Sequence, residues 1–351
     1  MTHQTATEGI TTIGIDLGKN TFHLIGMDAR GRIMLRRKVS RGQLQSCLAN
    51  LPACLIGLEA CAGAHHVGRQ LAALGHDVRL LPVQYVKPFL KGHKNDYRDA
   101  EAIAEAAQRP TMRPVPLKSA EQLDLQALHR VRSRLIGQRT AVINQIRGFL
   151  LACGIPVRQG PAGLREALPA ILAQRTDVLS PRMIHLIEDL TGDWRGLDDR
   201  IETLTGDITA LARQEAGCRR LMGIPGVGVI TASAMVAAIG TGAAFAKGRD
   251  FAAWLGLVPK QISTGDRTIL GGLSKRGNRY LRTLFVSGAQ ALLQRPHHWQ
   301  GHRFGRWLLT AAPRLHRNVL AAALANKLAR MAWSVLYRER GYEAEFVTPM
   351  P

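Results

Sequence analysis

Four acidic residues in the first part of the chain have the types and spacing of a metal site. They are Asp16 in GIDLGKN, Glu59 in GLEA, and Asp96 and Asp99 in NDYRDA. Carboxylates that gather at one point repel each other, and a divalent cation offsets that repulsion. Hard oxygen ligands in this number suit Mg²⁺, with Mn²⁺ as an alternative. Two such ions could clamp a phosphodiester and stabilise the attacking and leaving oxygens of a displacement.

Three elements of the chain are expected to position these acids. Asp16 and Glu59 each end an apolar run of the strand type, whereas Asp96 and Asp99 stand three apart at the head of a helical run. Strand ends and a helix start can meet at one sheet edge, so the sequence predicts a single cluster. An acid at a strand end or in the first helical turn is also an ordinary turn or cap residue. For Asp16 taken alone, that second reading stays open.

A second candidate lies in the stretch QISTGDRTILGGLSKRGNRYLR. This stretch is polar, glycine-rich and basic between two helical runs, which predicts an exposed loop. Ser263 is the candidate nucleophile, although a serine hydroxyl needs a base, a metal or nearby cations to attack phosphorus. Without that help Ser263 is an ordinary loop serine. The residues predicted to contact nucleic acid here are Lys275, Arg276, Arg279 and Arg282.

The motif GIPGVG, at residues 223–228, precedes an apolar helical run. It resembles the hairpin of helix-hairpin-helix modules, in which backbone N–H groups hold a DNA phosphate at a helix start. Gly226 and Gly228 are therefore predicted phosphate contacts. A purely structural helix junction is the alternative.

The charge of the chain indicates a polyanionic partner. The 351 residues include 47 Lys and Arg against 26 Asp and Glu, a formal net charge of +21. Residues 1–150 carry +10, residues 151–216 carry −3 and residues 217–351 carry +14. Neutralisation of phosphates is the usual source of nucleic-acid affinity, so both basic regions favour nucleic acid. The acidic middle suits self-association better.

The fold expected first is an α/β domain. Strands are predicted at Thr12–Leu17, Thr21–Met27 and Arg32–Val39, and helices then alternate with two further strands, up to the helix that begins at Asp96. This pattern predicts a mixed sheet with helices on its faces. The order of elements resembles the ribonuclease H-like fold.

The rest of the chain is expected to be mostly helical. Residues 119–153 and 164–214 have apolar positions at spacings of three and four, as a helical hairpin or coiled coil requires. Three domains are predicted, at residues 8–150, 151–216 and 217–351. Five cysteines without paired spacing indicate reduced thiols in a cytoplasmic protein. No signal-peptide core and no apolar run of membrane-span length are expected, hence no membrane partner.

Together these motifs resemble the DEDD insertion-sequence transposases related to the Piv DNA invertase. The motifs that carry the resemblance are GIDLGKN, GLEA, NDYRDA, GIPGVG, GLVP, the Ser-Thr-Gly stretch and LSKRGNRYLR, in that order between Ile13 and Tyr337. The resemblance implies an N-terminal RuvC-like domain, a coiled coil, and a C-terminal transposase domain whose serine attacks DNA. Some members of this family are guided by a structured bridge RNA that pairs with donor and target DNA.

Carried onto this chain, the resemblance makes Asp16, Glu59, Asp96 and Asp99 the Mg²⁺ ligands and Ser263 the nucleophile. Counting forward from GLVP selects Thr264 instead of Ser263, so both hydroxyls stay open. The resemblance further implies homodimers that assemble into a tetramer with donor and target DNA and the RNA. It also implies a bacterial protein that associates with the nucleoid when it acts.

Three other classes of protein remain as alternatives. A RuvC-like nuclease or junction resolvase would use metal-activated water and leave no covalent adduct. A sugar-kinase or actin-type ATPase shares the GIDLGKN type of phosphate loop but needs a second such loop. A non-catalytic nucleic-acid-binding protein would show no metal-dependent product.

Overall fold

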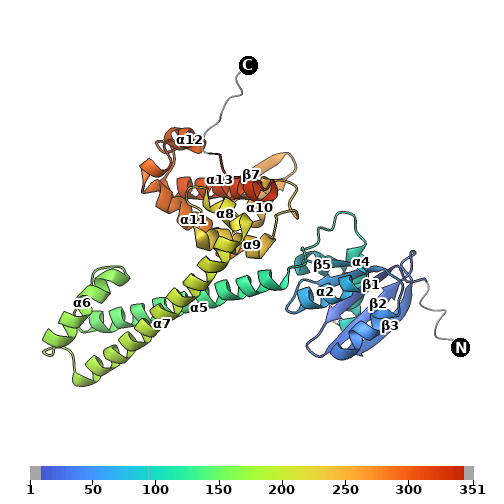
Figure 1. Ribbon diagram of the computed structural model, residues 1–351, viewed down its shortest axis with the longest axis horizontal. Coiled ribbons are helices and arrows are strands. Elements are labelled where there is room, and N and C mark those ends of the chain that lie inside the picture. The colour runs from blue at the N-terminus through green and yellow to red at the C-terminus, as the bar shows by residue number, and fades with distance from the viewer. Residues whose placement is uncertain (1–8, 94, 344–351) are drawn as a thin grey trace, which may run out of the picture. The chain divides into compact units, whose positions relative to one another are not determined.

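A computed structural model describes residues 9–93 and 95–343 of the chain (Figure 1). The chain divides into two compact units, Met1–Ala120 and Glu121–Pro351. Residue 8, where the predicted first domain begins, and residues 344–351, where the predicted last domain ends, lie outside the described residues.

A five-stranded mixed sheet forms the centre of the first unit, with strand order β3-β2-β1-β4-β5. The central strand, β1, pairs antiparallel with β2 and parallel with β4. The predicted mixed α/β domain is therefore confirmed. The strands are β1 (Thr12–Leu17), β2 (Thr21–Met27), β3 (Ile33–Ser40), β4 (Leu55–Glu59) and β5 (Asp77–Leu81).

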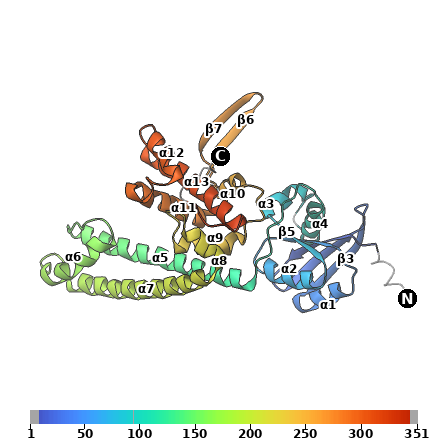
Figure 2. The same cartoon turned by 45° about the horizontal axis from the view of Figure 1, so that its top comes forward.

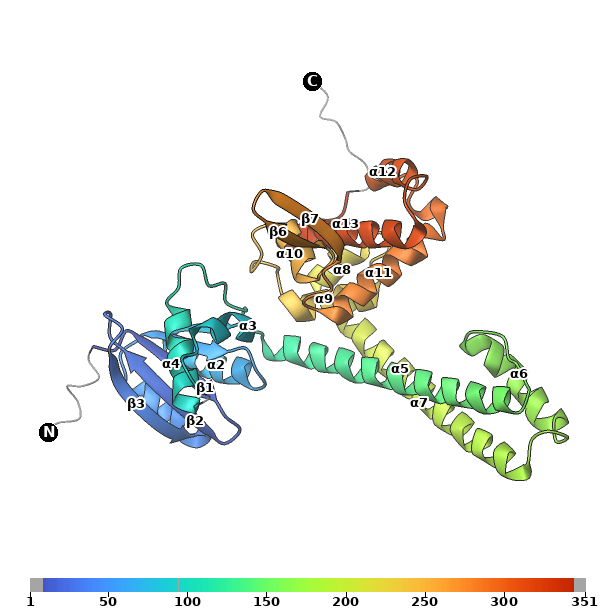
Figure 3. The ribbon, with the colours of Figure 1, turned by 180° about the vertical axis from the view of Figure 1, so that it is seen from behind.

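Helices cover both faces of this sheet. Alternate residues of the central strands, such as Ile13, Ile15 and Leu58, are fully buried in a core that includes Leu48 of α1 and Leu71 of α2. The other face is covered by α4, which lies against the sheet (Figure 3). The helical elements are η1 (Arg41–Gln43), α1 (Leu44–Ala49), α2 (Ala64–Ala73), α3 (Val83–Val86), η2 (Lys87–Phe89) and α4 (Asp96–Ala107).

Two glycines explain how α4 approaches the sheet so closely. A Cβ atom added at Gly14 would overlap the backbone of Ala100, and one added at Gly57 would lie 2.9 Å from the Cβ of Ala107. Because side chains alternate along a strand, the residues two positions further on, Asp16 and Glu59, lie on this same face. Each of the two strands therefore has a glycine where α4 packs against the sheet and a carboxylate at its carboxyl end.

The second unit begins with two long antiparallel helices, α5 (Ala120–Ala152) and α7 (Pro181–Gln214), connected through the shorter helix α6 (Pro161–Gln174). Arg139 of α5 pairs with Asp198 of α7 at 2.9 Å, and Ile146, Ile187 and Trp194 are among the buried residues of their shared core. The prediction of helix for residues 119–153 is confirmed. The predicted helix of residues 164–214 is two helices, separated where residues 175–180 leave the helical conformation.

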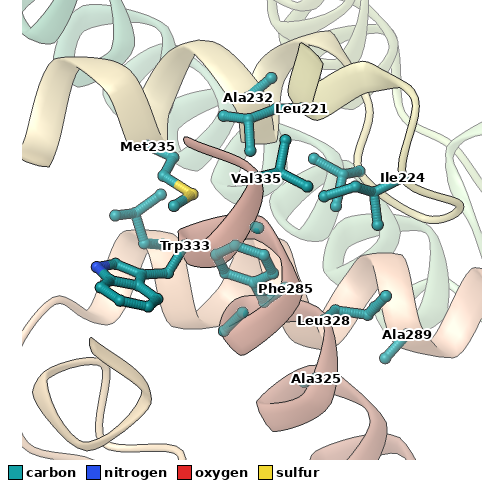
Figure 4. Packing of buried hydrophobic residues seen from close by; sticks show 14 of the residues in the cluster. Leu221, Ile224, Ala232, Met235, Phe285, Ala289, Ala325, Leu328, Trp333 and Val335 are labelled. Carbon is teal, nitrogen blue, oxygen red and sulfur yellow. The ribbon is translucent and has the colours of Figure 1, made fainter. Parts of the chain in front are cut away.

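A second core lies in the remainder of this unit (Figure 4). Phe285, Leu328, Trp333 and Met235 pack there, on helices α11, α13 and α9. The remaining elements are α8 (Ala216–Met222), α9 (Val229–Ile239), α10 (Gly248–Trp254), β6 (Pro259–Thr264), β7 (Arg267–Leu273), α11 (Arg279–Leu293), η3 (Pro296–His298), α12 (Arg303–Ala311) and α13 (Arg317–Tyr337).

The segment expected to be a loop around Ser263 is instead a β-hairpin of strands β6 and β7. Figure 2 shows it projecting from the helices of its unit. The prediction of exposure is confirmed, because every residue of β6 is exposed. Without a buried face, these strands have no alternation of apolar and polar residues from which strand structure could be predicted.

The first compact unit ends at Ala120, whereas the predicted domain extended to residue 150. The reason is that α5 finds its packing partners in α7: beside the Arg139 pair, Arg132 donates to Thr205 at 2.7 Å. A helical run shows only that it has an apolar face, not which segment covers it. The boundary predicted at residue 216 stays a prediction.

One helix among the described residues, α13, has the length and apolar composition of a membrane span. The expectation that no run has this length is wrong for α13. Leu324, Leu328 and Ala332 of this helix are fully buried in the core of the second unit. Its apolar composition therefore serves packing inside a domain.

Candidate functional site

The parallel pairing of β1 and β4 brings the first two acids next to each other. Ile15 of β1 is in register with Leu58 of β4, so Asp16 and Glu59 follow side by side at the carboxyl ends of adjacent strands. Both side chains are half-buried. The register therefore brings the two strand ends together, as predicted.

The start of α4 supplies the other two acids. The side chain of Asn95 caps the helix by accepting a hydrogen bond from the Tyr97 N–H at 3.0 Å. Asp96 and Asp99 then fall in the first turn, which is also where the helix dipole stabilises negative charge. One carboxylate oxygen of each of Asp16, Asp96 and Asp99 lies within 4.8 Å of the other two. This set is called the acid cluster below, together with Glu59.

The negative charges of the cluster affect the pKa of Glu59. The pKa of its carboxyl is raised above its usual range by burial and by the charges of Asp16 and Asp99, while Lys87 acts in the opposite direction. A carboxylate in this environment is destabilised until a cation arrives. The donor set of oxygen atoms and the mutual repulsion both fit a hard divalent cation.

A histidine that the sequence analysis did not identify also borders the cluster. His23 of β2 is the register partner of Asp16, and its side chain is buried. Its Nδ1 lies 3.5 Å from Oδ2 of Asp96, and its ring meets the edge of the Tyr97 ring at a centroid distance of 4.8 Å. His23 stands at an inward position of a predicted strand that neighbours the Asp16 strand, which is the signal that could have identified it.

In the second unit, the candidate nucleophile sits on β6. Ser263 is paired with Thr268 and Thr264 with Arg267, so the register places Ser263 and Thr264 on opposite faces of the hairpin. The Ser263 hydroxyl accepts a hydrogen bond from Nε2 of Gln261 at 2.9 Å, and Oγ1 of Thr268 lies 3.5 Å away. Both candidate hydroxyls are exposed and accessible to a substrate.

The four predicted cations lie beyond the base of the hairpin, in the connection after β7 and at the start of α11, whereas Ser263 is near the tip. Lys275, Arg276 and Arg279 are exposed, and Lys275 has a left-handed backbone with φ 54°. Arg282 is half-buried and donates hydrogen bonds to the carbonyl oxygens of Leu255, at 2.8 Å, and Arg276, at 2.9 Å. Arg282 therefore fixes the segment that carries the other cations.

The Gly-rich turn packs against α11. Gly226 has φ 80°, and a Cβ added there would lie 2.6 Å from a methyl group of Leu292. Conversely, a Cβ added at Gly288 would overlap the carbonyl oxygen of Gly226. Gly228 is the N-cap residue of α9 and has open space around it. Close packing thus accounts for Gly226, and the geometry at Gly228 leaves room for a phosphate.

Comparison with known proteins gives matches to two family descriptions. "Transposase IS116/IS110/IS902 family" matches residues 218–306, a range that contains Ser263. The DEDD transposase description of the IS110 type matches residues 13–155, a range that contains all four acids.

Individual relatives match over nearly the whole chain. "Probable family 20 transposase" of Pseudomonas aeruginosa is 45% identical over 95% of this chain and 98% of its own length. "Transposase for insertion sequence element IS1328" of Yersinia enterocolitica is 41% identical, over 93% and 96%. "Transposase for insertion sequence element IS1111A" of Coxiella burnetii is 40% identical, over 95% and 91%.

Proposed function

Since the chain belongs to the IS116/IS110/IS902 family of insertion-sequence transposases, we propose that it exchanges DNA strands through a covalent serine intermediate. The observation that carries this proposal is the convergence of Asp16, Asp96 and Asp99 beside Glu59. An exposed serine near the tip of a hairpin supplies the second element that the proposed strand exchange needs.

The family implies a divalent metal, and we propose that it is Mg²⁺, held by Asp16, Glu59, Asp96 and Asp99. When bound, Mg²⁺ would supply Lewis-acid stabilisation of charge on the scissile phosphate and its leaving oxygen. The protein's part is to hold the carboxylates in place before the substrate arrives. The N-cap at Asn95 and the close packing of α4 on Gly14 support that preorganisation.

In the first step, Oγ of Ser263 attacks the scissile phosphorus. A bond forms between Oγ and phosphorus, and the bond between phosphorus and the 3′ oxygen breaks. The hydroxyl proton of Ser263 leaves to solvent, and the departing 3′ oxygen is protonated to a 3′ hydroxyl. Lys275, Arg276 and Arg279 are exposed beyond the base of the hairpin and would hold flanking phosphates of the same DNA.

In the second step, the freed 3′ hydroxyl attacks the 5′-phosphoserine of the partner duplex. The bond between phosphorus and Oγ breaks, and Ser263 recovers its proton. One phosphodiester is made for each one broken, so strand exchange needs neither hydrolysis nor an external energy source. A crossed-strand junction is the intermediate.

The assembly we propose is a homodimer that becomes a tetramer on donor and target DNA, in which the acid cluster of one subunit meets Ser263 of another. A bridge RNA, as in family members related to the Piv invertase, would select both DNA sequences by base pairing. The net charge of +21 supports a complex that holds several nucleic-acid strands at once.

A RuvC-like nuclease that uses metal-activated water is the second candidate. The acid cluster alone would suffice for it, and the mixed sheet with the acids at its edge is the arrangement such a nuclease needs. The exposure of Ser263 on a hairpin favours strand exchange over hydrolysis, because a hydrolytic enzyme needs no second nucleophile.

A denaturing gel decides between the two. The full chain is incubated with Mg²⁺, flanking RNA and labelled donor and target DNA. We expect a protein-linked DNA band that disappears in Asp16→Asn and Ser263→Ala and persists in Asp77→Asn, an acid at the opposite end of the sheet. Cut DNA with free ends, and no linked band even from the wild type, would assign the nuclease reaction.

A further inference from the structure

The edge strand β3 carries three consecutive cations, Arg36, Arg37 and Lys38, all of them exposed. Alternation sends their side chains to different faces. Arg37 is in register with Leu24, which belongs to the core under α1 and α2. Lys38 is in register with His23 and Arg36 with Ile25, and both of those partners lie on the face that α4 covers.

The strand register extends from Lys38 straight to the acid cluster. Lys38 pairs with His23, His23 pairs with Asp16, and Glu59 follows Leu58, the neighbour of Ile15. One transverse row across the sheet therefore reads cation, histidine, acid, acid. Neighbouring strands lie about 4.8 Å apart, so the backbone of β3 is about 10 Å from that of β1.

Arg36 is linked to the same cluster through its side chain. Its guanidinium carbon lies 4.3 Å from the centre of the Tyr97 ring, an arrangement typical of a cation–π contact. Tyr97 in turn meets the ring of His23, which contacts Asp96. Stacking on Tyr97 limits the conformations of Arg36, and the residue as a whole stays exposed.

We propose that Arg36 and Lys38 form a phosphate-binding row that holds the nucleic-acid strand entering the acid cluster. This proposal rests on the proposed function, since it assumes that the cluster acts on a phosphodiester. A polyanionic strand is repelled by a cluster of carboxylates, and cations beside the cluster offset that repulsion. Nucleotides rise about 3.4 Å each along a duplex, so one strand reaches the cluster and the row within a few nucleotides.

The other role for charged residues on an edge strand is to prevent pairing with other sheets. That role would be served by Arg37 as well as by its neighbours. The two explanations therefore differ in what they predict for Arg37, which has the same charge and the same strand but the opposite face.

The test measures binding of fluorescein-labelled duplex DNA to the full chain, with EDTA present, over a series of NaCl concentrations. Removing one phosphate-binding side chain should make the slope of log K against log[salt] shallower by about 0.9. We expect a change of about 1.8 in R36Q/K38Q and none in R37Q. Single-stranded RNA of equal length, measured in parallel, shows whether the row serves DNA, guide RNA or both. An unchanged slope in R36Q/K38Q on both ligands, or an equal change in R37Q, would overturn the proposal.

A second measurement separates this proposal from the proposed function. Binding of Mn²⁺ to the metal-free chain, followed by electron paramagnetic resonance, should be intact in R36Q/K38Q and abolished in D16N. If the wild type bound no Mn²⁺, the proposed function would fail while the salt slopes still decided the role of the row.

Discussion

Gly14 of β1 and Ala100 of α4 are in backbone contact, and a Cβ added at Gly14 would overlap the Ala100 carbonyl and come within 2.9 Å of the Ala104 Cβ. Ala100 directly follows Asp99. The contact therefore sets how far the first turn of α4 stands above the sheet, and so how closely Asp99 approaches Asp16. Gly14, which has no Cβ, thus allows the close approach of α4 on which the geometry of the acid cluster depends.

Replacing Gly14 by alanine should disturb both stability and metal binding. The added methyl group has backbone atoms in its way, so α4 must shift, at a cost of about 2 kcal/mol or more in the free energy of unfolding. The shift separates Asp99 from Asp16, and Mn²⁺ affinity should fall at least tenfold. Denaturant unfolding and Mn²⁺ titration measure the two effects.

Gly42→Ala is the matched control, because a Cβ at Gly42 has nothing within 4 Å. We expect its stability and Mn²⁺ affinity to equal those of the wild type. Wild-type Mn²⁺ affinity in Gly14→Ala would show that the position of α4 does not control the cluster.

Removing the charge of Glu59 should stabilise the metal-free protein and abolish its response to metal. Burial and the charges of Asp16 and Asp99 raise the pKa of Glu59, so its ionised form is unfavourable in the fold. We expect the metal-free Glu59→Gln protein to melt at a higher temperature than the wild type. Added Mg²⁺ should raise the Tm of the wild type and of Asp77→Asn but not that of Glu59→Gln. A metal-free Tm below that of the wild type would contradict the repulsion.

The acids were predictable from sequence because each one stands at the end of an element with a strong local signal. Asp16 and Glu59 end apolar strands, and Asp96 follows an Asn that caps a helix. His23 was missed, because its role depends on the register between β1 and β2, which local patterns do not fix. The hairpin of β6 and β7 was missed because its residues are almost all exposed, so no period-two pattern marks them.

His129, a buried histidine of α5, forms hydrogen bonds with residues of α9 and α11. The Ser233 hydroxyl donates to the Val229 carbonyl at 2.6 Å, so it accepts from Nε2–H of His129 at 3.0 Å. The other nitrogen of His129, Nδ1, then accepts from the Tyr280 hydroxyl at 3.1 Å. Burial is the main cause that lowers the pKa of His129 to about 4, with Arg132 contributing. The neutral form is the one that fits this network.

His129 should therefore make the folded protein less stable in acid. An unfolded chain binds a proton at this histidine below pH about 6.5, whereas the folded chain does so only near pH 4. Stability contributed by neutral His129 is present above that window and is lost as the pH falls through it, by about 3 kcal/mol in total. Unfolding free energies between about pH 7 and pH 4.5 should decline less steeply in His129→Gln. The exposed His185→Gln is the control, and a His129→Gln slope equal to that of the wild type would contradict the prediction.

The opposite faces of Ser263 and Thr264 make the identity of the nucleophile testable. Only a hydroxyl on the side that meets the DNA can form the adduct, so one of the two alanine variants should lose it completely. We expect loss in Ser263→Ala and a protein-linked yield within about threefold of the wild type in Thr264→Ala. Mass spectrometry of the nuclease-trimmed adduct should place the phosphate on Ser263. A phosphate found on Thr264 would reassign the nucleophile.

Arg279 and Arg282 lie on the same helix but should respond differently to loss of charge. Arg282 donates to the carbonyls of Leu255 and Arg276, so Arg282→Gln leaves these acceptors without a charged donor and should cost about 2 kcal/mol of unfolding free energy. Arg279 is exposed, and Arg279→Gln should leave the unfolding free energy within about 0.5 kcal/mol of the wild type while weakening DNA binding. Denaturant unfolding combined with DNA titration separates the two. If Arg282→Gln kept full stability and lost DNA affinity, Arg282 would contact DNA directly; in the expected case, it acts by shaping the segment on which Lys275 and Arg276 stand.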